Sequence, residues 1–384
     1  MFGLSISEIL IISLILVTSL NCILNYFCCS RTLKLFETKQ NLRIAINKLR
    51  IYDQYVLSKV NLVVALFYFV VSYCFFSEIN GANNFLLMFS CLLSFGLSLI
   101  TIFVSRLYYC YTCNVLLETK INELDCFVLN LKRLVSIYLP FVICSFVVPF
   151  VYLLDIDYIW RHILCVISLA LILCLWMIFN PKMVIFSNGA KKIEKNSFLR
   201  YRLEQVFEAH GIKKYELYLW DSSRSKEANA MVCGFKKYHL LLSSSLVEEI
   251  TLPELESVIL HEIGHIKNKH LLKLMIGKIF MIISITFMIL APYLFNLNYF
   301  YKVIFCFLTV LIVVLELIAS IGVERRYELE ADSYANCYSD SELFSSALKK
   351  IVKYEEVEHK NLVDEIFQSH PDIDQRIDVK EKEK

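Results

Sequence analysis

The sequence predicts a mainly α, polytopic membrane protein with seven transmembrane helices and a cytosolic α+β domain. Two observations support this fold class. Of the 384 residues, 57% are hydrophobic and only 20% are charged, which is more apolar surface than a soluble chain of this size can bury. Apolar runs of about 18 residues or more, long enough to cross a bilayer as a helix, recur along the chain. The net charge of +2 creates no field that attracts DNA or RNA, so no nucleic-acid partner is expected.

Seven apolar runs qualify as transmembrane helices. They cover approximately residues 4–29, 60–76, 85–105, 134–154, 163–179, 272–295 and 303–323. The short-loop Lys and Arg residues gather after the first and third spans, which places these loops in the cytosol and the N-terminus outside. The long polar segments then also lie in the cytosol. Glu316 is the chief ionisable residue within the spans, and this scarcity argues against a transporter or channel.

These spans divide the chain into four regions. They are a five-helix transmembrane region at 1–179, a cytosolic domain at 180–271, a transmembrane hairpin at 272–323 and a cytosolic C-terminal segment at 324–384. Soluble chemistry is expected in the two cytosolic regions. Most of the 14 cysteines lie inside apolar runs and are expected to be packing thiols. The lone Cys110 and Cys113 pair lacks a second pair or a thioredoxin-like context, so packing is favoured over metal or redox chemistry.

The segment 249–265 is predicted to be a helix. Thr251 and Glu254 match a capping box at its start, and the apolar residues that follow keep helical spacing. This register places His261 and His265 one turn apart on one face of the helix. The pattern is HExxH, in which two imidazoles bind one Zn²⁺ and the intervening glutamate, Glu262 here, addresses a water molecule.

A second acidic cluster follows the last predicted span. Glu328 and Asp332 are four residues apart, which suits a third zinc ligand and a carboxylate that orients a zinc-binding imidazole. Two histidines and Glu328 complete the three protein ligands of a catalytic zinc site. Because two spans separate Glu328 from the HExxH helix, all three ligands fall on the same side of the membrane.

Two further segments have open interpretations. The apolar run 237–244 is bounded by polar residues and predicts a strand. This strand either forms a sheet edge above the zinc helix, to which a peptide can add, or is an ordinary core strand. His370 and Arg376 form a polar cluster near the C-terminus, which on its own is typical of a solvated tail.

With these motifs, the chain resembles the type I CAAX prenyl endopeptidases, the seven-span members of a larger family of membrane zinc metallopeptidases. The resemblance rests on four motifs in the family's order. They are SRSKEANAMVCGF at 223–235, HEIGH at 261–265, ELEAD at 328–332, and SHP at 369–371 followed by Arg376 and Ile377. It covers roughly residues 180–384, and the first five spans match in number and placement.

The resemblance implies a zincin-like metalloprotease domain of the HExxH/ExxAD gluzincin type. The implied zinc ligands are His261, His265 and Glu328. Glu262 is the implied general base, and Asp332 the implied carboxylate behind the ligands. The residues implied to line the substrate cleft are Asn229, His370 and Arg376. In this interpretation they stabilise the tetrahedral oxyanion or hold the peptide backbone.

Together these features predict an integral-membrane zinc metalloendopeptidase with one Zn²⁺ per chain, acting at the cytosolic membrane surface. Its expected partners are the lipid bilayer and a peptide or protein substrate, prenylated or membrane-bound, with CAAX-type processing as the family expectation. The alternatives are a membrane-protein quality-control protease of the heat-shock type, and a catalytically inactive zinc-binding scaffold or transporter. The short chain favours a bacterial inner membrane, whereas the KxKxx pattern at 380–384 would indicate the endoplasmic reticulum of a eukaryote.

Overall fold

The structure is a computed structural model that describes residues 6–39, 84–117, 156–223, 228–295 and 297–352, with isolated positions that include Arg376. Most of the predicted spans 60–76 and 134–154, and also His370, lie outside the described residues. The chain divides into two compact units. One comprises residues 1–130, 138–173 and 281–316, and the other comprises residues 131–137, 174–280 and 317–384.

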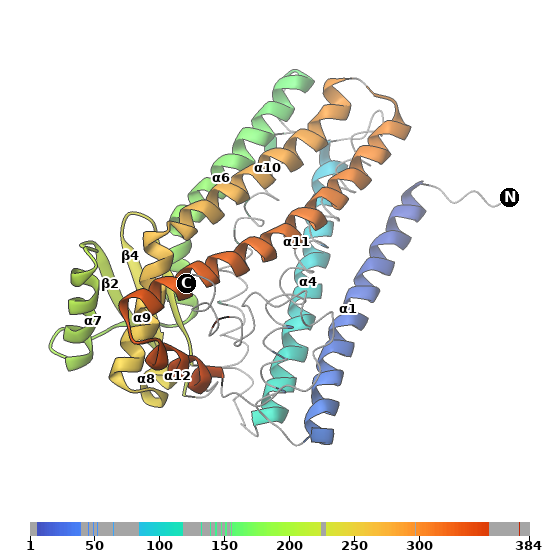
Figure 1. Ribbon diagram of the computed structural model, residues 1–384. Helices are drawn as coiled ribbons and strands as arrows, with labels where there is room; N and C mark the ends of the chain where they lie inside the picture. Colours follow the sequence, from blue (N-terminus) through green and yellow to red (C-terminus); the bar gives the residue numbers. More distant parts are fainter. Residues whose placement is uncertain are drawn as a thin grey trace. The chain divides into compact units, whose positions relative to one another are not determined.

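In the first unit, helices α1 (Ile6–Lys39) and α4 (Asn84–Leu117) lie against each other (Figure 1). Tyr26 and Tyr108 meet edge to face, with ring centroids 5.9 Å apart. Cys110 of α4 is disulfide-bonded. The sequence did not predict this disulfide, because a cysteine in an apolar segment is equally typical of a packing thiol.

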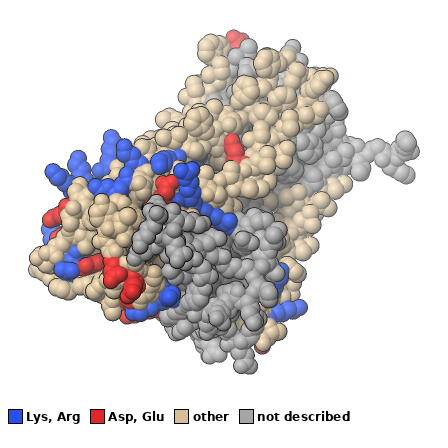
Figure 2. All heavy atoms as spheres, in the orientation of Figure 1, with Lys and Arg blue, Asp and Glu red and all other residues tan. Residues whose placement is uncertain are grey.

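Three further long helices carry apolar surface to the exterior. They are α6 (Tyr158–Ser187), α10 (His270–Leu294) and α11 (Tyr299–Tyr338). Within the described part of the chain, one helical stretch, Ile163–Ser187 with a mean hydropathy of 2.6, is long and apolar enough to cross a membrane. Leu171, Ile178 and Phe280 are each more than half exposed. The described surface of these helices is mostly uncharged, whereas charged side chains gather around the sheet (Figure 2), so the helical surface suits a lipid environment better than water.

The second unit contains a four-stranded sheet. Its strands are β1 (Lys191–Lys192), β2 (Tyr215–Trp220), β3 (Ala230–Cys233) and β4 (Tyr238–Ser243), in the order β1-β2-β4-β3. β2 and β4 are parallel, and both outer strands pair antiparallel to their neighbours. The turn between β3 and β4 requires Gly234, whose φ is +98° and whose place a Cβ would share with the Lys237 carbonyl oxygen.

The prediction that the run 237–244 could form a sheet edge is wrong, because β4 lies between β2 and β3. Leu240, Leu241 and Leu242 are fully buried, since both faces of the sheet are covered. An apolar run reads the same in an edge strand and in a core strand, so the pattern could not separate them. The outer strand on this side of the sheet is β3.

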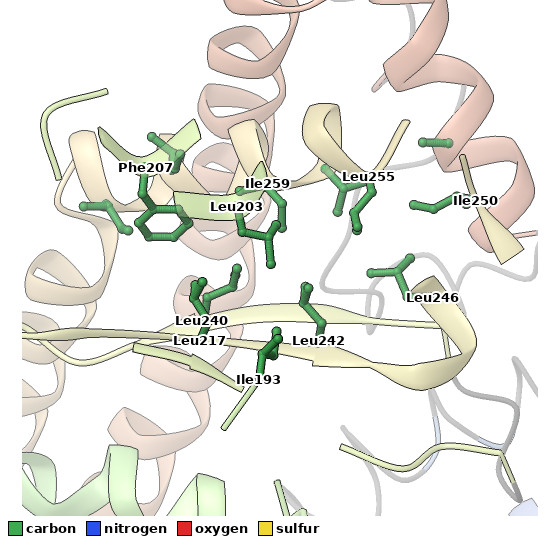
Figure 3. Close-up of a cluster of buried hydrophobic side chains, with 14 of the residues drawn as sticks. Ile193, Leu203, Phe207, Leu217, Leu240, Leu242, Leu246, Ile250, Leu255 and Ile259 are labelled. Carbon is green, nitrogen blue, oxygen red and sulfur yellow. The ribbon is translucent and has the colours of Figure 1, made fainter. Parts of the chain in front are cut away.

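Helices α7 (Phe198–Ala209) and α9 (Leu252–Lys267) cover one face of this sheet. Figure 3 shows side chains of both helices pointing toward the strands. The labelled helix side chains are Leu203, Phe207, Leu255 and Ile259, and those of the strands are Leu217, Leu240 and Leu242. All seven are at most 2% exposed, and burying such side chains stabilises the fold by about 1.5–3 kcal/mol each. α9, which carries the HExxH motif, is therefore anchored on a rigid core.

The N-terminus of α9 is held by the predicted capping residue. The backbone N–H of Thr251 donates to Glu254 Oε2 at 2.8 Å. Helix α12 (Ser341–Val352) adds the Ser346 hydroxyl at 2.6 Å from Glu254 Oε1 and the Lys350 ammonium at 2.8 Å from Glu254 Oε2. Burial opposes ionisation of Glu254, but these donors outweigh it and lower its pKa from 4.5 to about 2. Glu254 thus joins α9 to α12 as a buried carboxylate.

Replacing Glu254 with Gln is expected to lower the Tm of detergent-solubilised protein, equivalent to about 1–3 kcal/mol, because a buried charged acceptor is lost. The folded pKa lies below its ordinary value, so this contribution is complete above about pH 4.5 and disappears as the pH falls toward 2. The Tm difference from wild type should therefore shrink between about pH 7 and about pH 3.5. Glu248→Gln, at an exposed position of α8 (Ser244–Glu249), is the control. An equal difference at both pH values would contradict this account.

Helices α9 and α11 cross in direct contact at Gly264. A Cβ placed on Gly264 would lie 3.0 Å from Ala331 Cα and 3.0 Å from Tyr334 Cβ. Because one of these neighbours is backbone, a side chain at Gly264 would push the helices apart. Glycine at this position allows the close approach of the two helices that carry the predicted ligands.

The variant Gly264→Ala tests this contact. Helix propensity alone would favour alanine by about 1 kcal/mol, but the clash with α11 is expected to cost about 1–3 kcal/mol and to reduce the zinc bound per chain. Gly277→Ala in α10 is a matched control, since a Cβ there meets no atom within 4 Å. Thermal melting and metal analysis of both variants measure the two effects. Equal behaviour of the two variants would show that the crossing tolerates a methyl group.

Candidate metal centre

The crossing of α9 and α11 brings together three side chains that were predicted as ligands. His261 Nε2 lies 3.1 Å from His265 Nε2. Glu328 Oε2 lies 3.6 Å from His261 Nε2, and Glu328 Oε1 lies 3.5 Å from His265 Nε2. Each residue therefore directs one potential ligand atom toward a common point.

The spacing and the chemistry of this cluster fit a zinc ion. In a tetrahedral site with bonds of about 2.0–2.1 Å, the ligand atoms lie about 3.3 Å from one another. The observed separations of 3.1, 3.5 and 3.6 Å scatter around this value. Two imidazole nitrogens and one carboxylate are also a ligand set that Zn²⁺ prefers, and three protein ligands leave one position open.

The His265 imidazole is held in its neutral form. Burial is the largest effect, and together with the neighbouring His261 it lowers the pKa of His265 to about 3. A neutral imidazole keeps a lone pair on one ring nitrogen, which is the state that binds a metal.

The buried ion pair of Asp332 and Arg376 lies next to His261. His261 Nδ1 lies 2.8 Å from Asp332 Oδ1. Arg376 donates two hydrogen bonds to Asp332, from Nε to Oδ2 and from Nη2 to Oδ1, both at 2.7 Å. Burial opposes ionisation of Asp332, but the bonds from Arg376 and His261 outweigh it and lower the pKa of this carboxyl group. Asp332 is thus a fixed, charged group in close contact with the His261 ring.

Glu262 lies on α9 next to His261 and is 7% exposed. Its charge acts on two residues that come from other parts of the chain. Burial, followed by the charge of Glu262, raises the pKa of Cys233 on β3 to about 12. Burial alone would lower the pKa of Arg376, but Asp332 outweighs this effect and raises the pKa, and Glu262 makes a smaller contribution in the same direction. The carboxylate therefore lies within electrostatic reach of both the outer strand and the Arg376 guanidinium.

The predicted cleft residues have different positions. Asn229 directly precedes β3, where its N–H donates to Ser243 Oγ at 2.8 Å and its carbonyl accepts from the Ser243 N–H at 3.0 Å. Arg376 lies at the ligand cluster, with Nη2 3.8 Å from Glu328 Oε2. His370 falls outside the described residues.

The structure adds His270 and Glu330, which the sequence analysis did not single out as site residues. His270 Nδ1 lies 3.0 Å from His265 Nδ1, and His270 Nε2 lies 3.0 Å from Glu330 Oε2. The only available sequence signal was one more histidine in the polar segment after HExxH.

The residues of the ligand cluster lie within a segment that matches a known protein family. Residues 194–383 match peptidase family M48. This segment is therefore a peptidase family M48 domain. The match includes both the HExxH helix and the Glu328 cluster, so the family and the geometry single out the same part of the chain. A metallopeptidase of this family requires a metal cofactor, and the described cluster is a candidate site for it.

The fold is also similar to that of a solved structure, Ste24p from S. mikatae. The TM-score is 0.63 at 16% sequence identity, and the match covers 96% of this chain and 98% of Ste24p. The likeness thus extends beyond the peptidase segment to almost the whole chain. No curated protein matches the chain significantly.

The pair of Arg376 and Asp332 can be tested by removing its charges separately. Arg376→Met leaves a buried carboxylate with one partner fewer, and is expected to cost about 3–5 kcal/mol of stability. Adding Asp332→Asn should recover part of that loss, because no unpaired charge then remains. Arg202→Met, at a partly exposed pair with Glu256, is expected to cost only about 0–1 kcal/mol. Melting curves of the four proteins, including wild type, would contradict the pairing if the double variant were the least stable.

Proposed function

We propose that the chain is an integral-membrane zinc metalloendopeptidase that hydrolyses peptide bonds at the cytosolic membrane surface. The observation that carries this proposal is the convergence of His261, His265 and Glu328 at the spacing of a tetrahedral zinc site, beside the buried Glu262. The apolar exterior of the long helices supports a membrane location. The distribution of Lys and Arg supports an N-terminus outside and a C-terminus in the cytosol.

Each part of the site has a defined task in this reaction. When bound, Zn²⁺ supplies a Lewis acid that lowers the pKa of water and polarises the scissile carbonyl. Glu262 accepts a proton from the attacking water on its carboxylate and passes it to the nitrogen of the leaving amine. Asn229 and His370 are the proposed donors to the oxyanion. The two hydrogen bonds from Arg376 to Asp332 favour a positioning role for Arg376 over direct contact with the substrate.

The outer strand β3 is the proposed place for the substrate backbone. In the described sheet, β3 pairs with β4 on one side only, and it lies beside α9. An extended peptide can add to such an edge through main-chain hydrogen bonds. This assigns to β3 the role that the sequence suggested for the strand at 237–244.

The substrate class follows from the resemblance to type I CAAX prenyl endopeptidases. The match to Ste24p over almost the entire length of both chains supports this class. A heat-shock quality-control protease of four spans fits the five spans predicted before the HExxH helix less well. We therefore propose CAAX-type processing of prenylated proteins, with quality control as the alternative that the experiment below separates.

Glu262→Gln is expected to retain zinc and to lose cleavage by about 10²–10⁴-fold, because the amide cannot accept the proton. His261→Ala should lose both the metal and the activity. The measurements are zinc per chain and cleavage of a quenched peptide, with and without a farnesyl group, by detergent-purified protein.

A strong dependence on the farnesyl group would support CAAX processing, and equal cleavage of both peptides would support quality control. Full cleavage by the Glu262→Gln protein would contradict the proposed mechanism. Zinc without any cleavage by wild type would support the scaffold alternative.

A further inference from the structure

We infer that His270 and Glu330 position the second zinc-binding histidine through a relay of two hydrogen bonds. The relay runs from His265 Nδ1 to His270 Nδ1 at 3.0 Å, and from His270 Nε2 to Glu330 Oε2 at 3.0 Å. This inference rests on the proposed zinc site, because His265 must bind the metal through Nε2. His270 and Glu330 are not members of the ligand cluster of His261, His265 and Glu328. We therefore infer that they act through His265.

The protonation of each ring nitrogen follows from the metal site. With Nε2 of His265 on zinc, the proton of the neutral ring is on Nδ1, which therefore donates to His270. His270 Nδ1 must then accept, and its own proton is on Nε2. That nitrogen faces the Glu330 carboxylate, which can only accept. Every donor in the chain thus meets an acceptor, with both rings neutral.

The local backbone brings His270 to His265. In an uninterrupted α-helix, residues five apart differ by about 140° in direction, so their side chains do not meet. Here α9 ends at Lys267, and Lys269 adopts a left-handed conformation with a φ of 55° before α10 begins at His270. Such a conformation is unfavourable for a residue with a side chain. The strained turn therefore has a specific result, which is the contact between the two imidazoles.

His270 is also held in one orientation. It is 1% exposed, and its ring stacks on Tyr327 of α11 with centroids 4.3 Å apart and an angle of 7° between the planes. A buried imidazole that is fixed on two sides transmits its orientation to its partner. On α11, Tyr327 directly precedes Glu328 and Glu330 follows it by two residues. The same helix therefore supplies the proposed ligand Glu328 and the residues that hold His270 beside His265.

The two zinc-binding histidines are thus supported in different ways. His261 meets the carboxylate of Asp332 directly, whereas His265 reaches the carboxylate of Glu330 through His270. Glu330 is 32% exposed, whereas Asp332 is fully buried. The relay therefore extends from the metal site toward solvent. Its inferred role is to set the zinc affinity of the site.

The first variant pair separates positioning from general stability. His270→Leu removes the acceptor for His265 and is expected to lower zinc affinity by about 10–100-fold, the usual effect of losing a partner of a metal-binding histidine. His270→Asn keeps an amide oxygen near the place of Nδ1 and should recover part of that affinity. The readout is competition for zinc with a chromophoric chelator, together with the Tm of the metal-free proteins and kcat/KM.

A second pair and a control complete the test. Glu330→Gln retains an acceptor for His270 and should bind zinc more tightly than Glu330→Leu. His210→Leu removes a partly buried histidine that contacts Tyr334, and its zinc affinity should equal that of wild type.

Wild-type affinity in His270→Leu, or equal losses in His270→Leu and His270→Asn, would overturn the relay while leaving the proposed peptidase intact. Wild-type protein that binds no zinc would overturn both.

Discussion

The metal centre depends on the direct contact between α9 and α11. At Gly264 the two helices are too close for a side chain on α9. One turn of α9 presents His261 and His265, and the facing turns of α11 present Glu328 and Asp332. Because residues four apart lie on one face of a helix, a single crossing point sets the position of every ligand. The packing of α9 on the sheet then makes this crossing rigid.

The charged groups around the crossing are paired across long stretches of sequence. Asp332 is paired with Arg376, and Glu254 with Lys350. A buried carboxylate without such a partner would cost several kcal/mol, so these pairs couple the folding of the segments they join. Arg376 in particular makes residues after α12 a part of the site. The surroundings of the ligand cluster thus include the C-terminal region as well as the HExxH helix.

The sequence predicts the parts of the site that depend on local patterns. HExxH, the capping box of α9 and the ELEAD motif each lie within one or two helical turns, so their residue types and spacing were sufficient. The central place of β4 was not predictable, because it depends on which strands pair. The contact of His270 with His265 was not predictable, because it requires the left-handed conformation of Lys269 and no glycine marks that turn. Arg376 could be assigned only through the family resemblance, as its partner Asp332 is distant in sequence.

The ligands come from two stretches of chain that are separated by α10 and the first part of α11. A bound ion therefore closes a large loop, much as a disulfide does, and stabilises the folded chain in addition to taking part in the reaction. When the ion leaves, α9 and α11 are held only by their packing and by the pairs around it. Because proteases attack opened conformations, the supply of this metal would influence the lifetime of the protein in the cell as well as its activity. An idle, metal-free copy would then also be the copy that is degraded first.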